Sequence, residues 1–228
     1  MGFLFDSLKT ALELILSLDP EVYSTVWTSL YVSAIAIVFA TVAGVPAGLA
    51  IGIGRFPGRR VVITLLNTLM ALPTVVVGLV VYGFLSRMGP LGQFGLLFTP
   101  SAMIIGQIIL ATPIIANYTL GALSASDSRI MPTALTLGAS TTRGAILLLQ
   151  EIRFGVMAAI IAGFGRIIAE VGVAMMLGGN IRGYTRTMTT AIALETSKGE
   201  FAFGLALGIF LMSVALLINM FLNFLQQR

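Results

Sequence analysis

The sequence predicts an all-α integral membrane protein: five spanning helices, preceded by an amphipathic helix that lies in the membrane interface. Composition, long uncharged runs and the placement of the arginines all point to this class. Of the 228 residues, 57% are hydrophobic and 10% are charged, and the mean hydropathy is +1.02. Soluble domains carry about 25% charged residues. A soluble fold of this length could not bury so much apolar surface, so lipid is the expected solvent.

Five apolar stretches are long enough to cross the hydrocarbon core, which takes about 20 residues of helix. The expected spans are residues 27–53, 61–85, 101–123, 154–177 and 201–225. Glycines and prolines recur inside them, and membrane helices tolerate both because neighbouring helices satisfy the freed backbone groups. We interpret them as sites of close packing, with kinks along a moving pathway as the alternative.

The first residues differ from the spans. Residues 3–18 are too short to cross the membrane comfortably, and their polar side chains share one arc of a helical wheel: Asp6, Lys9, Thr10, Glu13 and Ser17. This pattern predicts an interfacial helix. A signal peptide is rejected because there is no basic start and no A-x-A-like cleavage site. The chain is therefore divided into residues 1–22, the interfacial helix, and residues 23–228, the spanning domain.

The arginines favour one side of the membrane. Those after the first span, those after the third span and the last residue all fall on the same side of a five-span chain: Arg55, Arg59, Arg60, Arg129, Arg143, Arg153 and Arg228. Lys and Arg mark the cytoplasmic side. The C-terminus is thus expected in the cytoplasm, and the N-terminus and the 86–100 and 179–200 loops outside.

Several kinds of chemistry are excluded. The chain has no Cys and no His, which removes a thiolate nucleophile, an imidazole base and a Cys/His zinc site. No G-x-x-x-x-G-K-[ST] motif occurs, so ATP cannot bind in the P-loop manner. We expect no catalytic residue, no metal site and no cofactor on this chain. A membrane enzyme is correspondingly disfavoured.

A polar interruption stands between spans three and four, in residues 134–150, ALTLGASTTRGAILLLQ. Pro132 can open a short helix, Gly138 allows a tight turn, and Ser140 is a plausible N-cap for a second helix that runs into span four. The whole segment, residues 124–153, is the longest cytoplasmic connection. It is either a helix that rests on lipid headgroups or a docking element for a cytosolic partner.

Two charges fall within span four. Arg166 and Glu170 are four residues apart, so they share a helix face and can pair. Charges inside a membrane are costly and mark functional candidates. They either hold helices or subunits in register, or place Arg166 on a pathway for a dianion, with Glu170 holding it.

The outer loop after span four is rich in groups that suit oxyanions. Arg offers planar donors and Thr single ones. Candidate contacts for an anion or for an extracytoplasmic receptor are Arg182, Thr185 and Arg186, with an ordinary polar loop as the alternative.

The 134–150 segment resembles the cytoplasmic loop of permease subunits of bacterial ABC importers. That loop reads E-A-A, three residues, G, nine residues, I-x-L-P. Residues Ala134, Gly138, Ala139 and Ser140 fit its core, and Leu148 fits its later hydrophobic position. The chain departs from the pattern at residues 132–133 and 150–151. The resemblance implies a type I importer permease core whose coupling helix contacts the ATP-binding subunit through Ala134, Leu137, Gly138, Ala139, Ser140 and Arg143.

Two further stretches resemble oxyanion permeases. Residues 72–92 are similar to the second core span of molybdate-type permeases. Residues 163–192, with G-N-I-x-G-x-T-R-x-M-T-T-A-I, are most similar to tungstate transporter permeases. The resemblance implies ATP-driven import of tungstate, or of molybdate or another oxyanion, across a bacterial or archaeal cytoplasmic membrane. It adds Met175 and Asn180 to Arg166 and Glu170 as pathway or gate candidates.

The same resemblance implies partners. A cytosolic ATP-binding subunit dimer would use the ATP, and an extracytoplasmic substrate-binding protein would deliver the anion, with no nucleic acid involved. Five spans are few for a complete pathway, so we expect a homodimer embedded in lipid. The alternative from another class is a stand-alone secondary transporter. It would need coupling-ion sites, and the spans offer few ionisable groups and no detectable inverted repeat.

Overall fold

The structure is a computed structural model that describes residues 2–226. Within these residues the regular secondary structure is entirely helical, joined by turns and short loops. The α-helices are α1 Gly2–Leu16, α2 Pro20–Ile53, α3 Arg59–Ala71, α4 Thr74–Leu85, α5 Pro100–Ala125, α6 Ile130–Thr136, α7 Thr141–Glu151, α8 Arg153–Ile168, α9 Gly172–Gly178, α10 Met188–Lys198 and α11 Phe201–Gln226. A 3₁₀ turn, η1, covers Gly92–Phe94. The all-α prediction is confirmed, while Arg228 lies outside the described residues.

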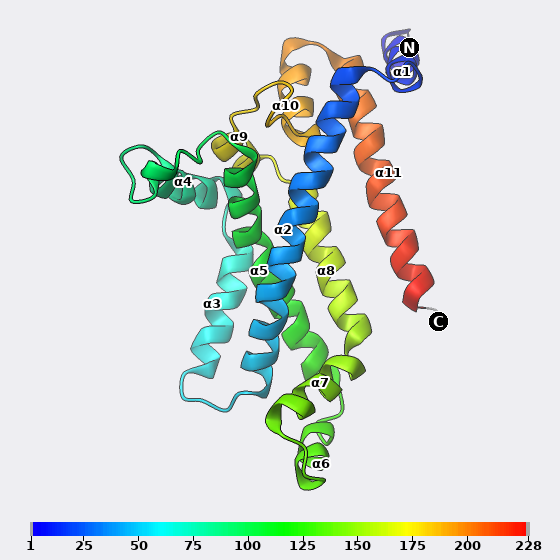
Figure 1. The fold of residues 1–228 in the computed structure, drawn as a ribbon. Helices are drawn as coiled ribbons and strands as arrows, with labels where there is room; N and C mark the ends of the chain where they lie inside the picture. Colours follow the sequence, from blue (N-terminus) through cyan, green and yellow to red (C-terminus); the bar gives the residue numbers. More distant parts are fainter. Residues whose placement is uncertain (1, 227–228) are drawn as a thin grey trace.

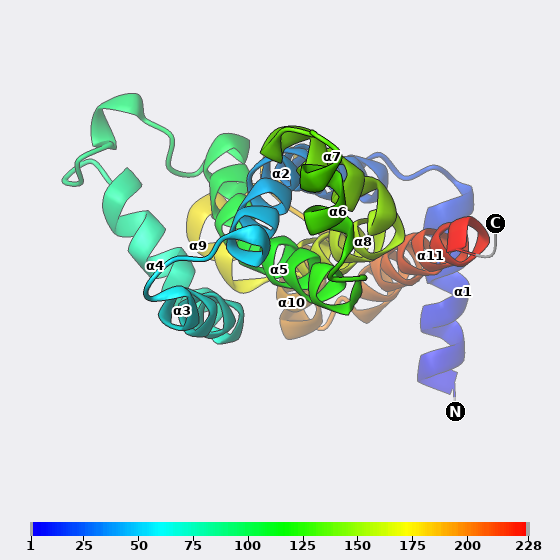
Figure 2. The ribbon, with the colours of Figure 1, turned by 90° about the horizontal axis from the view of Figure 1, so that it is seen from below.

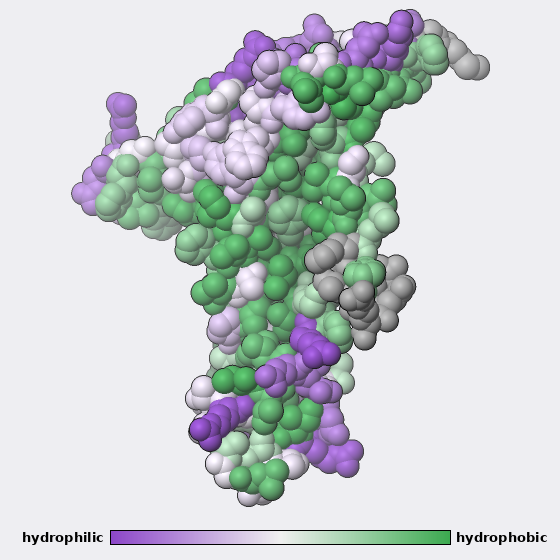
Figure 3. Space-filling model, turned by 45° about the vertical axis from the view of Figure 1, so that its right-hand side comes forward, coloured by the Kyte–Doolittle hydropathy of each residue, from purple (hydrophilic) through white to green (hydrophobic). Residues whose placement is uncertain are grey.

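Three helices, α2, α5 and α11, are each long and apolar enough to cross a membrane. Two bent pairs, α3 with α4 and α7 with α8, bring the possible number of spans to five. The surface agrees with this arrangement, because Figure 3 shows a hydrophobic waist between hydrophilic groups at the two ends. The structure therefore supports three to five crossings by length and composition.

A bundle of α2, α5 and α8 forms the centre of the fold (Figure 1). The helix α2 begins at Pro20, earlier than expected, because Asp19 caps it by accepting bonds from two backbone N–H groups. It packs against α5 at very short range. A Cβ at Gly48 would lie 2.5 Å from the carbonyl oxygen of Ala116 and 2.8 Å from the Cβ of Thr119. Small residues allow such approach in membrane bundles, which supports packing as the role of this glycine.

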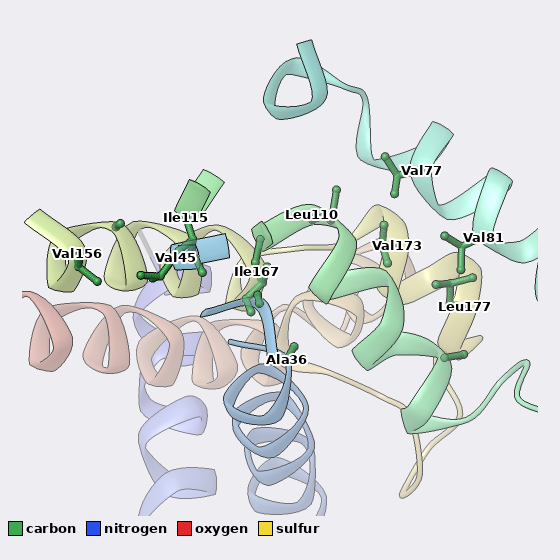
Figure 4. Close-up of a cluster of buried hydrophobic side chains, with 14 of the residues drawn as sticks. Ala36, Val45, Val77, Val81, Leu110, Ile115, Val156, Ile167, Val173 and Leu177 are labelled. Atoms are coloured by element: carbon green, nitrogen blue, oxygen red, sulfur yellow. The ribbon is translucent and has the colours of Figure 1, made fainter. Parts of the chain in front are cut away.

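The predicted second span is broken. The prediction of one helix over 61–85 is wrong, because α3 and α4 meet at an angle of 98°. Pro73 explains the break: it disfavours the helical conformation of the residue before it, and Leu72 is extended with ψ 136°. The turn brings α4 against α9. Figure 4 shows Val77 and Val81 of α4 facing α9 in the shared apolar core.

The predicted fourth span is also broken. We expected one helix over 154–177, but α8 ends at Ile168 and α9 starts only at Gly172. Its beginning differs as well, since α7 does not run straight into α8 but meets it at 72° next to Ile152. Both charges of this region therefore lie at or beside the end of a helix: Arg166 in the last turn of α8 and Glu170 in the break.

The outer connection after α9 contains a helix rather than a loop. The prediction of a polar loop over 179–200 is wrong, because α10 occupies Met188–Lys198 and packs against α11. Its N-terminus has a capping box formed by Thr187 and Thr190. Reciprocal caps satisfy backbone donors that a helix start leaves free. Thr187, Thr189 and Thr190 are all buried, so the threonine-rich sequence builds a hydrogen-bonded helix start rather than a polar surface.

The N-terminal helix α1 lies across the long helices, as Figure 2 shows, and contacts α11. Ser7 and Ala11 are buried, while Phe3, Leu4 and Phe5 are mostly exposed. Exposed large apolar side chains beside a polar arc suit a helix that rests in an interface. The existence of this helix agrees with the sequence prediction.

The close contact between α2 and α5 generates a stability prediction. Gly48→Ala should lower the free energy of unfolding by about 1–3 kcal/mol, because the new methyl group forces the two backbones apart. Thermal unfolding of the detergent-solubilised protein measures this. Gly121→Ala in α5 is the matched control, since a Cβ there meets nothing within 4 Å. Equal melting temperatures for the two variants would contradict the proposed packing.

Candidate functional site

The polar segment between α5 and α8 forms a helical hairpin. The helices α6 and α7 are joined by Gly138, whose φ of +85° suits glycine. Ser140 caps α7 by accepting a bond from the N–H of Arg143 at 3.4 Å, as the sequence predicts. The hairpin is close-packed, because a Cβ at Gly144 would lie 2.5 Å from the sulfur of Met131. The predicted helix–glycine–helix arrangement is confirmed.

The hairpin presents its turn to the outside. Ala134 is buried against α7, whereas Leu137 is 82% exposed, and Gly138, Ser140 and Arg143 are also exposed. Ala139 is half-buried. Figure 1 shows that α6 lies at one extreme end of the molecule, far from α1 and α10. Leu137 is therefore an exposed apolar side chain at the turn of the hairpin.

A buried carboxylate joins the two parts of the broken fourth span. The Nη1 of Arg166 donates to the Oε2 of Glu170 at 2.6 Å, and the N–H of Val173 donates to its Oε1 at 3.1 Å. The backbone carbonyl of Glu170 accepts a third bond from the hydroxyl of Thr189 at 2.7 Å. Glu170 therefore fixes the end of α8, the start of α9 and the start of α10 to one another.

The two charges of the pair have different surroundings. The side chain of Glu170 is 2% exposed, and that of Arg166 is 42% exposed. A buried carboxylate is stable only when it is paired and hydrogen-bonded, which Glu170 is. Arg166 keeps part of its guanidinium open. The geometry thus accommodates both interpretations of the sequence, a structural pair and an accessible cation.

Sequence reasoning missed two polar residues of this region. Gln107 in α5 is buried and donates from Nε2 to the carbonyl oxygen of Ile167 at 3.4 Å, which satisfies the end of α8. Ser29 in α2 accepts a bond from the N–H of Met188 at 2.7 Å, at the start of α10. Gln107 stands alone among apolar neighbours in α5, and an isolated polar side chain within a span was the signal that could have found it. Ser29 is one of several small hydroxyl residues in α2, next to Thr28, so nothing in the sequence singled it out.

No hydrogen bond or ion pair within the described residues joins the other two pathway candidates, Met175 and Asn180, to Arg166 or Glu170. Asn180 has a left-handed backbone with φ +51°, and its Oδ1 accepts from the hydroxyl of Thr190 at 2.9 Å. Asn180 therefore holds the connection between α9 and α10. Met175 is half-buried on α9.

The structure separates the three outer candidates. Thr185 is fully buried, and its hydroxyl donates to the carbonyl oxygen of Gly178. Arg186 is also buried, and its Nη1 lies 2.9 Å from Glu21 Oε1 and 3.3 Å from Glu195 Oε1. Only Arg182 is open to solvent: it pairs with Glu21, but its side chain is 71% exposed. Of these three candidates, therefore, Arg182 alone is accessible to an anion or a receptor in this conformation.

The fold is that of the membrane-spanning subunit of an ABC transporter. The crystal structure of a bacterial alginate ABC transporter, in complex with an alginate pentasaccharide-bound periplasmic protein, contains a chain of the same fold. The TM-score is 0.76 at 21% identity, over 99% of this chain and 89% of that one.

Residues 44–228 match the family described as the binding-protein-dependent transport system inner membrane component. The chain belongs to this family. It is 38% identical over its whole length, and over the whole length of the relative, to the tungstate uptake system permease protein of Peptoclostridium acidaminophilum. It is 40% identical to the protein of that name from Campylobacter jejuni, over 96% of this chain and 92% of the relative. The molybdenum transport system permease protein of Escherichia coli is more distant, at 28% over 80% and 83%.

Proposed function

We propose that this chain is the permease subunit of an ATP-driven importer that carries tungstate, a tetrahedral oxyanion, across the cytoplasmic membrane by alternating access. The observation that carries the proposal is its likeness, over essentially the whole chain, to two tungstate uptake permeases. Molybdate is the second candidate substrate, supported by the weaker likeness to a molybdenum permease.

The proposed coupling uses a continuous mechanical connection within the chain. A partner that presses on the α6–α7 hairpin acts on α8, because α7 contacts α8 and joins it directly at the 72° bend. The far end of α8 carries Arg166, whose bond to Glu170 transmits the displacement to α9 and α10. Packed helices with discrete arrangements move as units and transmit small shifts over long distances.

The proposed assembly is a homodimer of this chain with a cytosolic ATP-binding dimer and an extracytoplasmic receptor. The hairpin residues Leu137, Gly138, Ser140 and Arg143 are exposed as such docking requires. In this assembly the ATP belongs to the partner, since the sequence has no P-loop. The chain would cross the membrane five times, with α1 in the outer interface and the hairpin in the cytoplasm.

The substrate and the hairpin can be tested together in cells that lack this gene. Wild-type chain should restore tungstate uptake at low external concentration, with molybdate and sulfate competing weakly. Gly138→Trp should reach the membrane but reduce uptake at least about tenfold, because the indole occupies the exposed docking turn. Uptake is measured by elemental analysis of washed cells.

Gly95→Trp is the matched control for this experiment. Gly95 also has a positive φ, +59°, and a Cβ there also meets nothing within 4 Å. The two variants therefore share backbone strain and bulk, and uptake by Gly95→Trp should stay near wild type. Tungsten uptake that deletion of the gene leaves unchanged would overturn the proposed substrate. Uptake that persists without any ATPase would favour a secondary transporter.

The pathway role of Arg166 requires a variant that still folds. Arg166→Gln alone leaves Glu170 as a buried carboxylate without its charged partner, which destabilises proteins by about 3–5 kcal/mol. The double variant Arg166→Gln/Glu170→Gln removes both charges and leaves amides that can bond to each other. It should melt at a higher temperature than Arg166→Gln yet transport the anion at least about tenfold more slowly than wild type. Normal transport by the folded double variant would show that the pair is structural.

Receptor docking is proposed for the outer surface at Arg182. Charge reversal at the buried Arg186 would break the pairs with Glu21 and Glu195, so Arg182 is the informative position. Arg182→Glu should lower receptor-stimulated ATPase activity while the basal activity stays unchanged. Arg87→Glu, at an exposed arginine in the 86–100 loop, is the control. Equal stimulation of both variants would remove Arg182 from the docking surface.

A further inference from the structure

A cavity of about 890 Å³ lies between the turn that joins α2 to α3 and the coupling hairpin. One wall comes from the turn, including Phe56 and the two arginines Arg55 and Arg59. The opposite wall comes from the end of α5 and from α6 and α7, including Ser128 and Thr141. The volume falls within the range of about 300–1,000 Å³ that is typical of small-molecule sites.

The cavity carries an excess of positive charge. Within the described residues no carboxylate pairs with Arg55 or Arg59. The Nε of Arg59 donates to the carbonyl oxygen of Ile51 at 2.8 Å, which anchors the side chain and leaves its outer nitrogens for another acceptor. The acidic residue of the lining, Asp127, already lies 3.2 Å from the Nε of Arg129. The cavity therefore favours an anion.

The first turn of α3 strengthens this preference. It contains no acidic residue, and its N-cap, Gly58, supplies no side-chain bond. The start of a helix carries a partial positive charge from its free backbone N–H groups. Arg59, which lines the cavity, begins this helix, so no side chain of the first turn neutralises the positive field there.

The depth and the apolar part of the lining indicate which anion fits. The helix α2 has 34 residues and so is about 51 Å long, whereas the hydrocarbon core is about 30 Å thick and the bilayer with headgroups about 40–45 Å. The cavity lies at its C-terminal end, which a helix of this length places outside the hydrocarbon core and within reach of the headgroups. The lining beside the arginines includes three leucines, Leu123, Leu135 and Leu148. A free oxyanion has no apolar part to place against these leucines, whereas the acyl chains of a phospholipid can pack against them.

We propose that this cavity binds an anionic phospholipid, with its phosphodiester on Arg55 and Arg59 and the upper part of its acyl chains against the three leucines. The lipid would fill the space beneath the coupling hairpin. Within the described residues α6 packs mainly on α7, so the lipid would brace a hairpin that the rest of the chain supports only at its two ends.

The test measures lipid binding directly. Full-length permease extracted from its membrane is delipidated and titrated with phosphatidylglycerol or phosphatidylcholine of the same acyl chains, and the bound lipid is counted by native mass spectrometry. Phosphatidylglycerol should bind and phosphatidylcholine should not. Each arginine near an anionic surface contributes about a fivefold gain in affinity, so Arg55→Gln/Arg59→Gln should weaken phosphatidylglycerol binding by about 25-fold.

Arg60→Gln is the control, because Arg60 belongs to the same turn but does not line the cavity. Arg60→Gln should therefore weaken phosphatidylglycerol binding by less than the roughly fivefold factor expected for an arginine that contacts the lipid. Thr141→Glu gives a second approach that does not remove an arginine. It adds a negative charge to the lining at the first position of α7, where an acidic residue stabilises the helix. It should weaken lipid binding without unfolding the hairpin.

Three results would overturn the proposal. The first is equal phosphatidylglycerol affinity in wild type, Arg55→Gln/Arg59→Gln and Thr141→Glu. The second is arginine-dependent binding of free tungstate or inorganic phosphate with no lipid bound, which would make the cavity an oxyanion site. The third is loss of the ATP-binding partner in the double arginine variant with unchanged lipid binding, which would make the cavity part of the subunit contact.

Discussion

The bond between Arg166 and the buried carboxylate of Glu170 lies where a membrane helix stops and the chain turns back. Lipid offers no hydrogen bonds, so every backbone group freed by such a break needs a partner from the protein. Glu170 supplies one to the N–H of Val173 and accepts Thr189 at its own carbonyl, while Gln107 satisfies the carbonyl of Ile167. These bonds act together with the apolar packing of α8, α9 and α10 to fix the three helices relative to one another.

The remaining architecture follows from where the chain is rigid and where it is not. The centre, α2 against α5, is packed so closely that a single methyl group at Gly48 does not fit. The hairpin at the opposite end from α10 has few contacts beyond its own two helices. Low contact density marks the parts of a protein that move most easily. In the proposed coupling, the hairpin is the part that a partner can displace, and the direct connection of α7 to α8 carries that displacement into the stiffer bundle.

Charges are used differently at the two ends of the molecule. At the α10 end, Arg186 is enclosed by Glu21 and Glu195, and its charge is used to hold α10 to the start of α2. At the hairpin end, Arg55 and Arg59 have no acidic partner within the described residues and remain available. Arginine thus holds two helices together at one end of the molecule and remains accessible to an anion at the other. Net charge alone could not separate these uses.

Sequence by itself determined the solvent, the helical class, the apolar stretches and the helix–glycine–helix hairpin. Each of these depends on local composition or on the conformational freedom of one residue, such as Gly138. It did not reveal the breaks near Pro73 and Ile168, because hydropathy averages over a break that lasts two or three residues. Nor could it tell that Thr185 and Arg186 are buried while Arg182 is open, since all three stand in one polar run. Only the tertiary structure decided these points, because burial depends on which other elements pack against a residue. Arg186 meets Glu21 of α2 and Glu195 of α10, and Thr185 bonds to Gly178 of α9.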